Sequence, residues 1–193
     1  MSISPLILVV GPSGAGKDSL MEGARRRLAG DPRFHFARRT VTRPALAGVE
    51  DHDTMSPGQF ERMETAGGFL LSWRAHGLAY GVPAAVDGIR REGVAVVANV
   101  SRAVVDDARS RLQPVGVMVV TAPAPVLAAR LAKRGRERAE DIGLRLERAA
   151  APMPKGDDVR VVVNDASLEA GIEAFLAELH DLAQARTRAA TAG

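Results

Sequence analysis

Residues 11–17, Gly-Pro-Ser-Gly-Ala-Gly-Lys, have the types and spacing that bind the phosphate chain of a nucleotide. Gly11, Gly16 and Lys17 match the pattern G-x-x-x-x-G-K-[ST], whose glycines let backbone N–H groups turn toward phosphate oxygens. Lys17 would bridge the β- and γ-phosphates, and the helix that follows adds its positive end. The predicted nucleotide-binding residues are Gly11, Pro12, Ser13, Gly14, Ala15, Gly16, Lys17, Asp18 and Ser19.

Asp18 departs from this pattern, because Ser or Thr is usual at its position. Two unit charges about 5 Å apart at an effective dielectric near 20 repel by roughly 3 kcal/mol, so a carboxylate beside phosphate needs a reason. Either Asp18 binds Mg²⁺, which prefers hard oxygen ligands, or it points away and stabilises the helix N-terminus. We favour the metal role, because Asn99 and Ser101, after a later strand, stand where a metal-holding carboxylate is often found.

Valine-rich runs without polar alternation predict the buried parallel strands that would carry these residues. The expected strands are residues 6–10, 94–98, 115–120 and 159–163, with a fifth near 34–39. The expected helices are residues 17–28, 101–111, 123–133, 142–150 and 168–185. This alternation predicts a doubly wound parallel sheet flanked by helices, and together with the phosphate loop it indicates an α/β fold of the P-loop NTPase type.

Residues 38–88 interrupt the alternation with short polar and glycine-rich pieces and one clear helix, which Ser56 should cap. We expect a single domain with an inserted substrate-binding subdomain and a short arginine-rich lid. Its expected parts are a core of residues 1–37 and 89–186, an acceptor-binding subdomain of 38–88, a lid of 134–141 and a flexible tail of 187–193.

Composition narrows the function further. The 193 residues include no cysteine, which excludes disulfides and thiolate metal sites. Aromatic residues are 4% of the chain, too few for a base-stacking surface, so we do not expect nucleic-acid binding. The apolar N-terminal run is too short to span a bilayer, which predicts a cytoplasmic protein without membrane contact. The net charge of +3 comes mostly from arginine, whose fork suits small phosphorylated substrates.

Several motifs together resemble the guanylate-kinase-like P-loop kinases over nearly the whole chain. They are GPSGAGKDS, VTRP before an acidic cluster, GFLLSWRAHGLAYGVP, RLAKRGRE with IGLRLERA, and VVVND. The resemblance implies that the insertion holds the acceptor, that the lid closes on ATP, and that Asn164 lies by the adenine. The positions that read guanine in that family are Ser72 and Val82 here, whereas the phosphate-binding Arg43 and Tyr80 match. Two further family positions, an arginine and a tyrosine, are Ala45 and Thr54.

GKDS, LSWRAHGL-YGV, NxSRA and RGRE with LRLERA are instead similar to the ribose 1,5-bisphosphate phosphokinases of phosphonate breakdown. That resemblance implies transfer of phosphate from ATP to ribose 1,5-bisphosphate, giving 5-phosphoribosyl 1-diphosphate, with Mg²⁺. The acceptor oxygen is already ionised, so no general base is required. A guanylate kinase is the alternative, followed by a non-catalytic guanylate-kinase-like binding domain. The prediction for the assembly includes a homodimer.

The remaining candidates are arginines and polar residues that would surround the transferred phosphate. The lid candidates are Arg134, Arg138 and Arg145, with Arg130 and Arg136 ranked lower. The acceptor candidates are Arg39, Arg43, Tyr80, Asn99, Ser101 and Arg102. His52 either touches ribose or is a solvated loop histidine, and Glu50, Asp51 and Asp53 either bind sugar hydroxyls or orient arginines.

Overall fold

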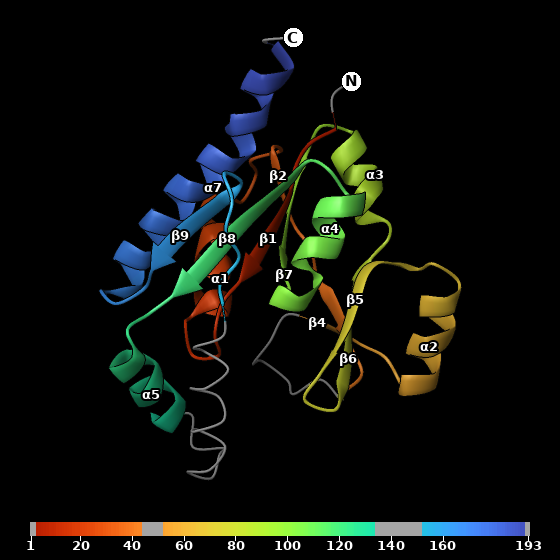
Figure 1. Cartoon of the computed structure of the whole chain (residues 1–193), viewed down its shortest axis with the longest axis horizontal. Helices are drawn as coiled ribbons and strands as arrows, with labels where there is room; N and C mark the ends of the chain where they lie inside the picture. Colours follow the sequence, from red (N-terminus) through yellow and green to blue (C-terminus); the bar gives the residue numbers. More distant parts are fainter. Residues whose placement is uncertain (1–2, 44–51, 134–151, 192–193) are drawn as a thin grey trace.

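The computed structural model describes residues 3–43, 52–133 and 152–191. Its main sheet has five parallel strands in the order β2-β7-β1-β8-β9 (Figure 1). The strands are β1 (Leu6–Val10), β2 (Phe34–Phe36), β7 (Ala95–Asn99), β8 (Val115–Thr121) and β9 (Val159–Val163). The predicted parallel sheet is therefore confirmed, with boundaries within one residue for the four valine-rich strands.

Both faces of this sheet are buried along its central strands β1, β7 and β8, which is why these strands read as continuous apolar runs, whereas the edge strand β9 leaves Val161 and Val163 exposed. Successive side chains of β1 enter different cores: Leu6, Leu8 and Val10 join one cluster, and Ile7 and Val9 join the other. The first cluster continues into the small second sheet, and the second is filled from the helices on the opposite face.

Helices cover the two faces unequally (Figure 1). One face carries α1 (Lys17–Arg27) and the long α7 (Leu168–Thr191), which pack on each other and supply apolar side chains to the same core. The other face carries α3 (Val86–Arg91) and α4 (Val105–Arg111). The helix expected at 101–111 begins as a short 3-10 turn, Arg102–Val104, and α5 (Ala124–Lys133) follows β8. None of the helices in the described part of the chain is long and apolar enough to cross a membrane.

Residues 38–88 contain a four-stranded sheet that the sequence did not reveal. Its order is β4-β3-β6-β5, with β3 (Arg39–Val41), β4 (His52–Thr54), β5 (Phe69–Ala75) and β6 (Leu78–Pro83). The expected fifth strand at 34–39 is thus two strands, β2 and β3, in different sheets. β2 and β3 have three residues each, which is too short for an alternating pattern to emerge, and this explains the error.

The helix predicted in this insertion is α2 (Pro57–Thr65). Ser56 Oγ accepts from the N–H of Gln59, and Gln59 Oε1 accepts from the N–H of Ser56 at 3.0 Å. This reciprocal capping box confirms the start of the helix. Phe60 faces inward from α2 and stacks on Phe69 of β5, with 4.4 Å between ring centroids, and so fixes the helix against the small sheet.

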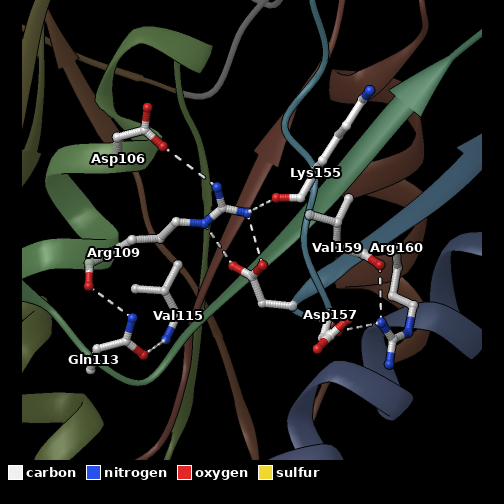
Figure 2. Close-up of polar contacts among 9 residues, drawn as sticks. Asp106, Arg109, Gln113, Val115, Lys155, Asp157, Val159 and Arg160 are labelled. Atoms are coloured by element: carbon white, nitrogen blue, oxygen red, sulfur yellow. Dashed lines mark hydrogen bonds and ion pairs between the residues drawn. The ribbon is translucent and has the colours of Figure 1, made fainter.

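Residues 152–158 lead into β9, and hydrogen bonds from Arg109 on α4 fix this segment (Figure 2). Both carboxylate oxygens of Asp158 lie 2.8 Å from the Arg109 guanidinium, whose Nη2 also donates to the carbonyl of Lys155 at 3.0 Å. A bidentate pair of this kind fixes direction as well as distance. The helix expected at 142–150 lies outside the described residues.

Candidate phosphate-transfer site

The loop after β1 has the backbone that phosphate binding requires. Gly14 and Gly16 have φ of 84° and 91°, a conformation that favours glycine. Gly11 approaches β8 so closely that a Cβ there would lie 1.9 Å from the carbonyl oxygen of Val120. The Lys17 ammonium donates to the carbonyls of Gly11 at 2.8 Å and Pro12 at 2.9 Å, and therefore lies across the loop.

Asn164 lies beneath this loop. Its side chain is 4% exposed, and Nδ2 donates to the carbonyl of Ala15 at 2.8 Å. A Cβ on Gly16 would meet Nδ2 at 2.4 Å, and one on Gly171 would meet Oδ1 at 2.8 Å, so two glycines make room for the amide. In the structure this amide holds the loop, and the expectation that Asn164 lies by the adenine stays a prediction.

We predict that Asn164→Asp weakens nucleotide binding much more than acceptor binding. A carboxylate cannot donate to the Ala15 carbonyl and would repel it, which displaces the loop N–H groups. The expected result is a KM for ATP raised by about ten-fold, equivalent to roughly 1.4 kcal/mol, with the acceptor KM changed less than two-fold. Steady-state kinetics with each substrate varied in turn would measure this, and equal rises in both KM values would contradict it.

Asp18 faces other polar residues instead of pointing away from the site. Its Oδ1 accepts a hydrogen bond of 2.7 Å from Asn99 Nδ2, and Arg39 Nη2 lies 3.8 Å from the same oxygen. Asn99 ends β7 and Arg39 begins β3, so the carboxylate touches both sheets. The side chain remains 53% exposed.

Of the predicted acceptor residues, Arg39 and Tyr80 lie on neighbouring strands of the small sheet, and Arg43 follows the end of β3 by two residues. Tyr80 of β6 pairs with Val41 of β3, two residues from Arg39 and two from Arg43. Because side chains alternate along a strand, Arg39 and Val41 lie on the face that carries Tyr80. The Tyr80 ring stacks on Trp73, with centroids 5.4 Å apart and planes at 5°, which fixes its position.

Ser101 and Arg102 follow Asn99 at the carboxyl end of β7, beside the phosphate loop at the end of β1. Ser101 Oγ accepts from the N–H of Ala103 and caps the 3-10 turn. Arg102 Nη1 lies 3.5 Å from Met153 Sδ, so the segment that Arg109 secures also borders this arginine.

The two positions that would read a guanine ring are not available for it. Ser72 is paired with Gly81 and so lies on the face opposite Trp73 and Tyr80. The hydrogen bonds from Arg74, and then the one from Ser72, lower the pKa of Glu64 on α2, so the Ser72 hydroxyl is directed at that carboxylate. Val82 is fully buried in the core.

His52 is buried in β4 at 6% exposure, so its description as a solvated loop histidine is wrong. The burial of His52 could not be predicted from the sequence, because its strand has only three residues. Asp53 pairs with Arg38 at 3.2 Å, which agrees with the alternative in which the acidic residues orient arginines. Glu50 and Asp51 lie outside the described residues.

Arg130 is a stronger candidate for phosphate binding than its sequence context suggested. Its Nη1 is buried without a hydrogen-bond partner in the described part of the chain, and lies 3.9 Å from where a Cβ of Gly16 would be. A buried guanidinium N–H beside a phosphate loop is costly unless an anion accepts from it. The sequence feature that pointed to Arg130 was its position on the helix just before the arginine-dense segment. The other lid candidates, Arg134, Arg136, Arg138 and Arg145, lie outside the described residues.

Solved structures agree with this architecture. A guanylate kinase from Anaplasma phagocytophilum superposes with a TM-score of 0.68 at 18% identity, covering 94% of this chain and 87% of that one. No protein-family model matches the chain. The parallel sheet, the phosphate loop and the second, small sheet thus define a P-loop protein of the guanylate-kinase-like fold.

Comparison with relatives of known name identifies the family within this fold class. Ribose 1,5-bisphosphate phosphokinase PhnN of Brucella melitensis is 46% identical over 177 residues, 92% of each chain. The protein of the same name in Acidiphilium cryptum is 52% identical over 171 residues, 89% of this chain and 90% of its own. The chain therefore belongs to the ribose 1,5-bisphosphate phosphokinase family. A bifunctional ribose 1,5-bisphosphokinase-thymidine phosphorylase of Azorhizobium caulinodans is 49% identical over 89% of this chain, which spans 25% of that protein.

Proposed function

We propose that the chain transfers the γ-phosphoryl group of ATP to the 1-phosphate of ribose 1,5-bisphosphate, giving ADP and 5-phosphoribosyl 1-diphosphate in phosphonate catabolism. The observation that carries this proposal is the family membership combined with an acceptor face that keeps Arg39 and Tyr80 but has no polar group at Val82. Such a site binds phosphate but offers no hydrogen-bond partner to the edge of a purine base.

The reaction breaks the bond between the β- and γ-phosphates and forms one from an acceptor phosphate oxygen to the γ-phosphorus. That oxygen is ionised at neutral pH, so positioning and charge neutralisation supply the catalysis. Lys17 and the loop N–H groups hold the nucleotide, and Arg130 reaches the phosphates from α5. Arg39, Arg43 and Tyr80 hold the acceptor, with Asn99, Ser101 and Arg102 at its edge. Arg134, Arg138 and Arg145 remain proposed lid residues.

The donor set near the loop fits Mg²⁺ bound mainly by phosphates. In the described part of the chain no three His, Asp or Glu side chains gather into a metal cluster, so a protein cage for the ion is not built there. Asp18 offers one half-exposed carboxylate beside the loop, and Mg²⁺ commonly takes one or two carboxylates with substrate phosphates and water. When bound, the ion would neutralise charge on the β- and γ-phosphates.

We predict that Asp18→Ala raises the Mg²⁺ requirement. Loss of the carboxylate removes a metal ligand, and the half-saturating Mg²⁺ concentration should rise by about ten-fold, or roughly 1.4 kcal/mol. The measurement is ADP release as a function of free Mg²⁺ at saturating ATP. An unchanged titration would remove the metal role and leave Asp18 as a residue of the helix N-terminus.

The decisive assay compares two acceptors. With ribose 1,5-bisphosphate, a coupled assay should show rapid ADP release, and with GMP the kcat/KM should be lower by at least about 10³-fold, since the base-reading contacts are missing. Comparable rates with GMP would favour the guanylate-kinase alternative. Absence of ADP release with both acceptors, alongside measurable ATP binding, would favour the non-catalytic binding domain.

The fused relatives add chemical support for a pentose 1-phosphate acceptor. The protein of Azorhizobium caulinodans and a second one from Cupriavidus pinatubonensis carry the name of a thymidine phosphorylase beside that of the kinase. Phosphorolysis of an N-glycosidic bond produces a sugar 1-phosphate, the same anomeric group that this kinase would extend. We also propose residues 38–88 as the acceptor-binding part and 134–141 as the lid; a homodimer stays a prediction.

A further inference from the structure

A single oxygen of Asp18 is shared by residues from two different sheets. Asn99 of the main sheet donates to Oδ1 at 2.7 Å, and Arg39 of the small sheet lies 3.8 Å from it. Asn99 is a neutral donor that orients the carboxylate without neutralising it. Arg39 supplies the opposite charge, and its own side chain is 17% exposed.

We propose that Asp18 couples metal binding to acceptor binding, because Arg39 and a divalent cation compete for its carboxylate. This inference rests on the proposed function, in which Arg39 holds an acceptor phosphate. When the metal binds Asp18, Arg39 loses its partner and becomes available to the acceptor. When an acceptor phosphate draws Arg39 away, Asp18 becomes more negative and binds the metal more tightly.

The geometry suits such an exchange. At 3.8 Å the Arg39–Asp18 contact is longer than a hydrogen bond, so charge holds the pair and the guanidinium fork is not engaged. A phosphate dianion can accept two parallel N–H bonds from the same fork, which is a stronger contact. Pairs that remain partly exposed to water contribute little and are easily displaced. The coupling must be reciprocal, since each ligand changes the affinity of the other by the same factor.

The first experiment leaves the acceptor out. Calorimetry measures binding of a non-hydrolysable ATP analogue at increasing Mg²⁺, in the wild type and in Arg39→Gln. The variant should need about two- to five-fold less Mg²⁺, because Asp18 has lost its competing cation. The matched control is Arg38→Gln, which removes the same charge from the adjacent residue. Because Arg38 pairs with Asp53, its loss should change the Mg²⁺ requirement less.

A double-mutant cycle isolates the role of Asp18. In the Asp18→Asn background, Arg39→Gln should no longer change the Mg²⁺ requirement. A second readout uses Trp73, the single tryptophan, which stacks on Tyr80 and reports acceptor binding by fluorescence. With the analogue present, ribose 1,5-bisphosphate should bind the wild type about two- to five-fold more tightly when Mg²⁺ is added, and Asp18→Asn should lose this gain.

Two results would overturn the coupling. One is an unchanged or higher Mg²⁺ requirement in Arg39→Gln; the other is an equal shift in the Asp18→Asn background, which would mean a general charge effect. Failure of the proposed function is seen separately, as absence of ADP release by the wild type with ribose 1,5-bisphosphate. The metal titration contains no acceptor and therefore stands independently of that assay.

Discussion

Replacing Lys17 by methionine is expected to lower kcat/KM by about 10³-fold, the largest effect on activity that we predict. The ammonium lies across the phosphate loop, held by the Gly11 and Pro12 carbonyls, so it is already in place for the β- and γ-phosphates. Because it neutralises charge that moves onto the leaving ADP, its loss should lower kcat as well as nucleotide affinity. Steady-state kinetics with varied ATP would separate the two effects.

Lys155→Met is the matched control. Lys155 is an exposed lysine whose backbone carbonyl accepts from Arg109, and its ammonium extends away from Arg109 (Figure 2). Removing this charge should change kcat/KM less than two-fold. Lys17→Arg should restore little activity, because a planar fork does not replace a compact ammonium inside a glycine loop. Turnover of Lys17→Met within ten-fold of the wild type would contradict the assignment.

Replacing Arg90 by methionine is expected to lower the free energy of unfolding by about 3–5 kcal/mol, the largest effect on stability that we predict. Arg90 is fully buried and donates to the carbonyls of Ser4 at 3.2 Å, Leu112 at 2.5 Å and Pro114 at 3.1 Å. It also pairs with Asp87 at 3.0 Å. Burial lowers the pKa of this guanidinium, while Asp87 opposes the shift. Methionine would leave these acceptors unsatisfied.

Arg91→Met provides a control from the adjacent residue. Arg91 pairs with the same carboxylate, Asp87, but its side chain is 70% exposed, so its loss should cost about 1 kcal/mol or less. Urea unfolding of the three proteins would give the comparison. Arg90 lies at the amino ends of β1 and β8, away from the phosphate loop, so Arg90→Met should keep its kcat/KM at a temperature where it is folded. A stability change below about 1 kcal/mol would contradict the prediction.

The sequence was informative wherever one segment alone determines structure. Residues 6–10 form a strand because all five side chains are apolar and buried, and the helix after Lys17 begins where glycine ends the loop. The capping box at Ser56 likewise depends on residues three apart. The three-residue strands β3 and β4 were not recognised, since their pairing with distant partners decides them.

The contacts that arrange the site are long-range. Asp18 and Asn99 are 81 residues apart, and Asn164 and Ala15 are 149 apart, so no local pattern predicts that they touch. The sequence suggested that Asp18 compensates for Asn99, but only the fold brings Arg39 to the same oxygen. The sequence does not single out Arg130, because neither segment alone predicts that α5 approaches Gly16.

By itself, the sequence determined the phosphate loop, the parallel strands and the family, because glycine spacing, apolar runs and the helix cap act over a few neighbouring residues. Tertiary structure decided which side chains meet: Asn164 beneath the loop, Ser72 turned toward Glu64, and Arg39 beside Asp18. The physical reason is that hydrogen bonds and ion pairs act over a few ångströms in space, and packing of the two sheets and their helices sets those distances.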